Sequence, residues 1–167
     1  MMKENKSVGV VAYLNNLLHN LKTNCDSLTD EQFTMLLEDF PRPVIQSQSA
    51  CKRLTDEQFD YCIKKDQDDT PLMYALDRLS NKQFEDQIRK HPWTALMNKE
   101  ANARLSDTQF DYCLKHAPCH PCPEYVLKRM NPIQLDDYVK SFYATYPSNY
   151  PVNRYINTYQ KSWLDKV

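Results

Sequence analysis

The segment Leu28-Thr-Asp-Glu-Gln-Phe33 decides the fold, because it returns along the chain at an almost constant spacing. The later copies are Leu54-Thr-Asp-Glu-Gln-Phe59, Leu79-Ser-Asn-Lys-Gln-Phe84, Leu105-Ser-Asp-Thr-Gln-Phe110 and the degenerate Met130-Asn-Pro-Ile-Gln-Leu135. The first residues of successive copies are separated by 26, 25, 26 and 25 positions. A fixed period of this length is typical of a repeat protein, in which each unit packs against its neighbours.

Each copy carries the residues that start a helix. The Thr, Ser or Asn in second place can accept a hydrogen bond from a free backbone N–H, and the Gln three residues later can bond back to the cap's own N–H. This is a capping box, and the flanking Leu and Phe stand at the two positions of a hydrophobic staple. Apolar residues then recur at three- and four-residue spacing. We therefore expect helices to begin just after Leu28, Leu54, Leu79 and Leu105.

A second helical segment completes each unit. It begins near Pro43, Pro71, Pro92 or Pro123 and ends at an arginine just before the next copy. We therefore predict an all-α protein, a short α-solenoid of about five helical hairpin repeats in one domain. The expected parts are an N-terminal capping helix (7–27), four repeats (28–53, 54–78, 79–104 and 105–129), and a degenerate repeat with a tyrosine-rich C-terminal helix (130–167).

The signature Gln-Phe-Asp-Tyr-Cys occurs twice, over residues 58–62 and 109–113. Together with the segment 92–96, it resembles degenerate tandem helical repeats of uncharacterised bacterial and prophage-type proteins, over about residues 28–140. The resemblance implies a fold but no known activity. By analogy with mobile-element proteins of this size, it suggests an inhibitor that acts on a larger host complex, such as a CRISPR–Cas defence complex.

The composition excludes several classes of protein. The chain has 167 residues, a net charge of -1 and a single glycine, Gly9. Phosphate-binding loops, dinucleotide-binding folds and nucleophile elbows need glycine at sharp turns, so these classes are excluded. The balanced charge argues against a duplex-DNA binder, which needs an excess of cations. No membrane-spanning stretch or signal peptide is recognisable, so we expect a cytoplasmic protein with reduced cysteines.

The densest group of potential ligands is Cys113, His116, Cys119 and Cys122, which recur every third residue. Thiolates and imidazoles in groups of four bind structural zinc, and His120 is an alternative ligand. The C-x-x-C spacing of Cys119 and Cys122 also suits thiol exchange at a helix N-terminus. The structural alternative is a proline-rich loop with incidental cysteines, in which Cys113 packs as a small core residue. Zinc is the one cofactor that the sequence suggests.

Several side chains recur once per repeat. Arginines end the units, at Arg53, Arg78, Arg104 and Arg129, and acidic residues follow the staple, at Asp60, Glu85, Asp111 and Asp136. The two sets form either a charged partner-binding groove or a ladder of hydrogen bonds and ion pairs between repeats. Tyr61 and Tyr112 occupy matching positions in the signature and either pack between repeats or anchor a protein partner.

The C-terminal segment is rich in aromatic and basic residues. Those that we expect to contact a partner are Tyr143, Tyr146, Tyr150, Arg154, Tyr155 and Tyr159. Aromatic rings beside cations can also stack single-stranded bases. The structural alternative is a terminal cap whose rings cover the last repeat.

Together these features favour a non-enzymatic protein–protein interaction module that binds a protein partner through its recurring tyrosines and arginines and its aromatic tail. No catalytic set and no small-molecule site stand out from the sequence. Two alternatives stay open. One is a zinc- or thiol-dependent protein that uses the segment from Cys113 to Cys122, and the other is a binder of single-stranded nucleic acid that uses the tail.

Overall fold

The computed structural model describes residues 4–117 and 121–145, with side chains from Val10 onward except that of Tyr143. Every regular element in these residues is a helix, and none of these residues forms a strand, which confirms the all-α prediction. The chain divides into two compact units, Met1–Lys90 and His91–Val167.

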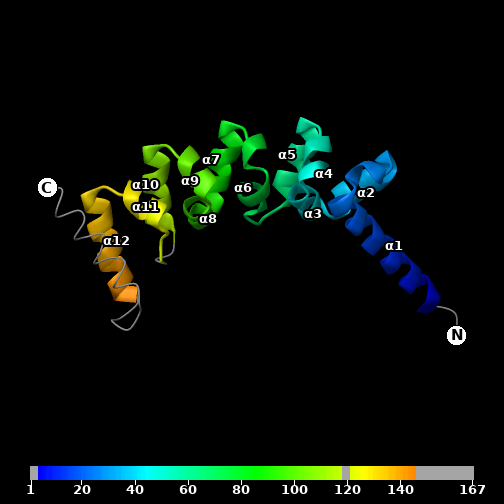
Figure 1. Cartoon of the computed structure of the whole chain (residues 1–167), viewed down its shortest axis with the longest axis horizontal. Coiled ribbons are helices and arrows are strands. Elements are labelled where there is room, and N and C mark those ends of the chain that lie inside the picture. Colours follow the sequence, from blue (N-terminus) through cyan, green and yellow to red (C-terminus); the bar gives the residue numbers. More distant parts are fainter. Residues whose placement is uncertain (1–3, 118–120, 146–167) are drawn as a thin grey trace. The chain divides into compact units, whose positions relative to one another are not determined.

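The first unit contains the N-terminal helix, two complete repeats and the first helix of the third repeat (Figure 1). Its elements are α1 (Glu4–Thr23), η1 (Cys25–Ser27), α2 (Asp30–Asp39), α3 (Pro41–Gln46), α4 (Gln48–Arg53), α5 (Asp56–Lys65), α6 (Thr70–Tyr74), η2 (Leu76–Arg78) and α7 (Asn81–Lys90). The helix α1 packs against α2, α3 and α4, while α3 packs against α5 and α6. The N-terminal helix therefore contacts the first repeat, and the first repeat contacts the second.

The second unit contains the rest of the third repeat, the fourth repeat and the start of the fifth. Its elements are α8 (Pro92–Met97), α9 (Lys99–Arg104), α10 (Asp107–His116), α11 (Glu124–Arg129) and α12 (Pro132–Thr145). The helix α8 packs against both α9 and α10. Val139 and Phe142 of α12 form a small buried cluster with Leu135 and Tyr138. The C-terminal helix that we expected beyond α12 lies outside the described residues.

All five predicted helix starts are present. In α5, the Gln58 N–H donates to Thr55 Oγ1 at 3.2 Å, and the Thr55 N–H donates to Gln58 Oε1 at 2.9 Å. The same two bonds join Thr29 with Gln32, Ser80 with Gln83, Ser106 with Gln109, and Asn131 with Gln134. The helices α2, α5, α7, α10 and α12 each begin one residue after the cap, so the predicted register is confirmed.

The staple residues lie in the core. Each leucine and each phenylalanine of the four best copies is at most 5 % exposed: Leu28, Leu54, Leu79, Leu105, Phe33, Phe59, Phe84 and Phe110. Burial of one such side chain stabilises the fold by roughly 1.5–3 kcal/mol relative to exposure. Each of these four repeats therefore contributes its own leucine and phenylalanine to the buried core.

The second half of the first and third repeats differs from the predicted single helix. In the first repeat, α3 begins at Pro41 rather than near Pro43, and Ser47 then caps a separate helix, α4. In the third repeat, Pro92 is the first residue of α8 and Asn98 caps α9. Ser47 and Asn98 each accept a hydrogen bond from a backbone N–H three residues later, which is the geometry of a new helix start. These repeats therefore have three helical segments in place of the predicted two.

Repeats of two kinds alternate along the chain. The 26-residue repeats, 28–53 and 79–104, each have three α-helices, whereas the 25-residue repeats each have two. The second halves of the 25-residue repeats, 54–78 and 105–129, hold α6 with η2, and α11. The larger period is thus one pair of repeats, or 51 residues, since the staple Leu79 follows Leu28 by 51 positions and Leu105 follows Leu54 by 51. The solenoid built from all five repeats stays a prediction.

Candidate functional site

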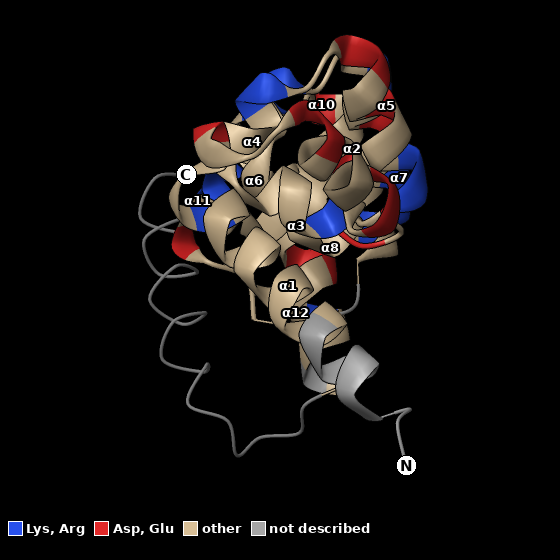
Figure 2. Cartoon of the chain, turned by 90° about the vertical axis from the view of Figure 1, so that its right-hand side faces the viewer, with Lys and Arg blue, Asp and Glu red and all other residues tan. Residues whose placement is uncertain are grey.

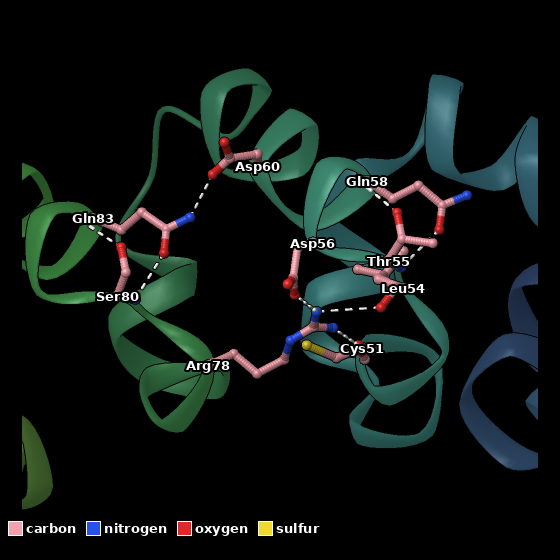
Figure 3. Close-up of polar contacts among 9 residues, drawn as sticks. All are labelled: Cys51, Leu54, Thr55, Asp56, Gln58, Asp60, Arg78, Ser80 and Gln83. Carbon is pink, nitrogen blue, oxygen red and sulfur yellow. Dashed lines mark hydrogen bonds and ion pairs between the residues drawn. The ribbon is translucent and has the colours of Figure 1, made fainter.

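Arg78, the last residue of η2, reaches back to the junction at the start of its own repeat (Figure 3). Its guanidinium donates to the backbone carbonyls of Cys51 and Leu54, the latter at 3.2 Å. The same group lies 3.3 Å from a carboxylate oxygen of Asp56 and 4.4 Å from the centre of the Phe59 ring. The last carbonyls of a helix have no intrahelical partner, so the arginine satisfies the end of α4 and fixes it against the start of α5.

Two further arginines repeat this arrangement, which we call the arginine clamp. Arg53 donates to the carbonyl of Leu28 at 3.0 Å and lies 4.5 Å from the Phe33 ring centre, and Arg129 donates to the carbonyl of Leu105 at 2.5 Å and lies 4.6 Å from the Phe110 ring centre. Arg104 ends α9 at the same register position. In the three clamps the guanidinium groups donate to atoms of the same chain, which supports the ladder interpretation. The arginines are therefore not part of the binding surface proposed below.

The capping-box glutamines link neighbouring repeats. Gln83 Nε2 donates to Asp60 Oδ1 of the preceding repeat (Figure 3), and Gln134 Nε2 donates to Asp111 Oδ1 in the same way. Each of these glutamines therefore uses its amide oxygen to close its own helix start and its amide nitrogen to hold the previous helix. One side chain sets both where a helix begins and how it sits against its neighbour.

A groove of about 640 Å³ lies between α5 and α7, and we call it the α5–α7 groove. Its apolar lining comes from Phe59, Ile63 and Leu79, all of them buried. Charged residues of both signs lie on the two flanking helices (Figure 2). The α5 wall carries Asp56, Glu57 and Asp60 beside Lys64, and the α7 wall carries Lys82 and Lys90 beside Asp86, so each wall carries both signs. Lys64 Nζ lies 4.0 Å from Asp60 Oδ2 of its own helix.

A smaller groove of about 340 Å³ lies between α10 and α12, and we call it the α10–α12 groove. Its apolar lining includes Trp93 and Leu96 of α8 and Leu114 of α10. Lys115 of α10 and Asp137 of α12 are exposed at its walls. Asp111 also lines the α10 wall, so that wall carries both signs, while the charged residue on the α12 wall is Asp137.

The two grooves are built from the same sequence positions. Seven positions that line the α5–α7 groove have an equivalent, 51 positions later, that lines the α10–α12 groove. The pairs are Asp60 and Asp111, Ile63 and Leu114, Lys64 and Lys115, Gln83 and Gln134, Asp86 and Asp137, Gln87 and Tyr138, and Lys90 and Ser141. The first five pairs keep the residue type or exchange Ile for Leu. The two-repeat period of the chain therefore produces two related grooves. The sequence analysis did not identify Lys64, Lys115, Asp86 or Asp137 as binding residues. The 51-residue spacing between the two lysines, and between the two aspartates, was a signal in the sequence that could have found them.

The tyrosines expected to contact a partner occupy the register position of the groove aspartates. Two residues after the staple phenylalanine, or after Leu135 in the last copy, the chain carries Met35, Tyr61, Asp86, Tyr112 and Asp137 in turn. Both tyrosines are half-buried. The Lys65 ammonium lies 5.6 Å from the centre of the Tyr61 ring, and Tyr112 stacks on His116 with 4.0 Å between ring centres. Each ring is therefore held by a residue of its own helix, and its role in partner binding stays a prediction.

The predicted contact residues of the tail lie outside the described residues. These are Tyr146, Tyr150, Arg154, Tyr155, Tyr159 and the side chain of Tyr143. In the described region just before them, the Cys122 N–H donates to the Tyr138 hydroxyl of α12 at 2.9 Å. This bond holds the segment that precedes α11 against α12.

The predicted zinc ligands that the structure describes have different surroundings. Cys113 is fully buried, whereas His116 is exposed and its Nδ1 lies 2.8 Å from the Tyr112 carbonyl oxygen of the same helix. Cys122 is half-buried, and Cys119 lies outside the described residues. Within residues 4–117 and 121–145, no three His, Cys, Asp or Glu side chains are arranged to hold a metal ion. The zinc and thiol hypotheses stay predictions.

Three other cysteines, Cys25, Cys51 and Cys62, are buried thiols. Burial raises the pKa of each thiol, that of Cys62 to about 12. The clamp residues Arg53 and Arg78 act in the opposite direction on Cys25 and Cys51, but their effect on the pKa is smaller than that of burial. At neutral pH these three thiols are protonated and behave as small core residues.

Comparison of the chain with known proteins finds no matching family model, no similar curated protein and no similar solved structure. Within the described part of the chain, no helix has the length and apolar character needed to cross a membrane. The case for a function therefore depends on the two grooves and the chemistry of their walls.

Proposed function

We propose that the chain is a non-enzymatic protein-interaction module that binds a partner protein through the α5–α7 and α10–α12 grooves. The observation that carries this proposal is the recurrence of seven lining positions in two grooves, among them the exposed pairs Lys64 with Lys115 and Asp86 with Asp137. Lys64 lies 4.0 Å from Asp60 of its own helix, and the exposed side chains Lys64, Asp86, Lys115 and Asp137 belong neither to the arginine clamps nor to the capping boxes. Their repetition therefore favours a role at the surface over a role in holding the repeats together.

The chemistry of the grooves suits recognition of a protein. Protein interfaces combine a desolvated apolar centre with a polar rim, and an anchor side chain that fills an apolar pocket supplies much of the binding energy. In the α10–α12 groove, the half-buried Trp93 and Leu114 offer apolar surface to such an anchor. Charges at the rim steer the partner and select its orientation more than they add affinity. Repeat scaffolds of stacked helices commonly present extended surfaces of this kind.

A pull-down with the full chain, from cells that naturally carry it, tests this proposal. The groove variant combines Lys64→Glu with Asp86→Lys, so the charges of both residues are reversed while the net charge is unchanged. The matched control combines Lys52→Glu with Asp39→Lys, two exposed residues outside both grooves. We expect the wild-type chain and the control to recover the same partner, and the groove variant to lose it. Recovery of no protein, or equal recovery by all three chains, would contradict the proposal.

A finer version makes the partner a component of a bacterial defence complex, such as CRISPR–Cas. Its support is the resemblance of the Gln-Phe-Asp-Tyr-Cys repeats to prophage-type proteins. A phage plaque assay in cells with active CRISPR–Cas interference tests it. Expression of the wild-type chain should restore plaque formation, and the groove variant should not. Interference that is unchanged by the wild-type chain would rule out this version without affecting the broader proposal.

A further inference from the structure

We infer that the N-terminal half of α1 binds the same half of α1 in a second copy of the chain, so that the protein forms a homodimer. The binding surface is formed by Val10, Val11 and Leu14, and we call it the α1 patch. This patch lies outside both grooves, so the inference goes beyond the proposed function and does not rest on it.

The α1 patch continues an apolar stripe that is already packed at its other end. Along α1, Val10, Leu14, Leu17 and Leu21 follow one another at spacings of four, three and four residues. A stripe with this spacing is typical of a helix that packs lengthwise against another helix. Leu17 is 2 % exposed and Leu21 is fully buried, because the first repeat covers the C-terminal half of α1. Ser47 Oγ of this repeat donates to the Leu21 carbonyl oxygen at 2.7 Å.

The cover provided by the first repeat ends near Tyr13. Gln32 Nε2 of α2 donates to the Tyr13 hydroxyl at 3.3 Å, while Tyr13 stays 48 % exposed. Beyond this contact, Val10 is 58 % exposed and Val11 is 57 % exposed, and the N-terminal part of α1 extends past the first repeat (Figure 1). Neighbouring apolar side chains in water favour association, because removing apolar surface from water lowers the free energy.

The charge pattern of α1 favours a second copy as the occupant of the patch. Residues 7–21 contain no Asp, Glu, Lys or Arg, although these residue types make up 26 % of the chain. A symmetric dimer brings a surface against itself, so any charge on that surface would meet the same charge. The exposed polar residues that follow the patch are Asn15 and Asn16, and an amide both donates and accepts hydrogen bonds. A surface of this composition is complementary to itself.

The same pattern argues against two other occupants. A helix that lies on an anionic lipid surface carries Lys and Arg on its polar face, and residues 7–21 contain neither. A helix that selects a different protein partner commonly does so through charged residues beside its apolar stripe, and residues 7–21 contain none of these either.

Sedimentation equilibrium of the full chain, from micromolar to millimolar concentration, tests the inference. We expect the wild-type chain to show a monomer–dimer equilibrium. Val10→Lys places two like charges in the interface and should weaken dimerisation by about tenfold or more. Because Val10 is exposed and lysine favours a helix, this variant should keep the wild-type midpoint in urea unfolding. The control is Ile133→Lys, which changes an exposed apolar residue of α12 and should leave dimerisation unchanged.

A pair of opposite charges tests whether the α1 patch meets itself. Val10→Glu should also weaken dimerisation, whereas an equimolar mixture of the Val10→Lys and Val10→Glu chains should form dimers more tightly than either variant by itself. A loss of stability cannot produce this recovery. Monomer at every concentration, an unchanged dimer in Val10→Lys, or a mixture that binds no more tightly than the separate variants would overturn the inference. Binding of the wild-type chain, but not of Val10→Lys, to phosphatidylserine vesicles without dimerisation would also overturn it and would assign the patch to a lipid surface.

Discussion

Replacement of Arg78 by alanine tests the arginine clamp most sharply. Its guanidinium donates to the carbonyls of Cys51 and Leu54, and hydrogen bonds from a charged group contribute about 1.5–3 kcal/mol each. The contact with the Phe59 ring adds about 0.5–1 kcal/mol. The ion pair adds little, because the Asp56 side chain is fully exposed. Since the Arg78 side chain is still 20 % exposed, water can replace part of these bonds, and we expect a net loss of about 3 kcal/mol.

Urea unfolding followed by far-ultraviolet circular dichroism measures this loss as a lower midpoint at an unchanged slope. Arg78→Lys keeps the charge but lacks the planar fork that reaches two carbonyls and stacks on a ring, so it should lose about half as much stability. The control is Arg42→Ala, which removes a side chain that is 51 % exposed and paired with Asp68 at the surface. The control should cost less than about 1 kcal/mol. If Arg78→Ala costs no more than Arg42→Ala, the clamp does not hold the repeats together.

Three further predictions test the core, the caps and the buried thiols. Phe59→Ala should lower the free energy of unfolding by about 3–5 kcal/mol in urea unfolding, because it empties a core position that is 2 % exposed; a loss below about 1 kcal/mol would contradict the register. Ser106→Ala should cost about 1 kcal/mol in thermal unfolding and Ser106→Asp much less, since aspartate also caps a helix, and equal losses would argue against the cap. The Cys62 thiol ionises near pH 9 in the unfolded chain, whereas burial raises its pKa to about 12 in the folded chain. The free energy of unfolding should therefore fall by up to about 1.4 kcal/mol per pH unit between pH 9 and about 12. An equally steep fall in Cys62→Ala would show that another group is responsible.

The helix starts could be predicted because their causes are local. Thr55 and Gln58 lie three residues apart and bond to each other, so their spacing alone determines the capping box. The three- and four-residue spacing of apolar residues likewise predicted that Phe59 lies in the core, where it is buried. Ser47 and Asn98 are also cap residues, yet the segments that they divide are only six residues long, too short to show a helical period of their own.

The atoms that the clamp arginines contact and the two grooves could not be predicted from the sequence, for a different reason. The recurrence of Arg78 and its equivalents was visible, but the atoms that they contact are backbone carbonyls, which carry no signature in a sequence. The grooves arise where α5 faces α7 and where α10 faces α12, so their lining depends on how helices pack. In the sequence, nothing distinguishes Lys64 and Asp86 from other charged residues, and only the structure shows that both line the α5–α7 groove.

The central claim is that the α5–α7 and α10–α12 grooves both bind the partner protein. Hydrogen–deuterium exchange of the chain with and without the partner recovered by the pull-down tests this claim most directly, since binding suppresses the local opening of the helices that it contacts. We predict slower exchange in peptides from α5 and α7 and, to a similar extent, in peptides from α10 and α12. Slower exchange confined to α1, or found on one groove alone, would contradict it.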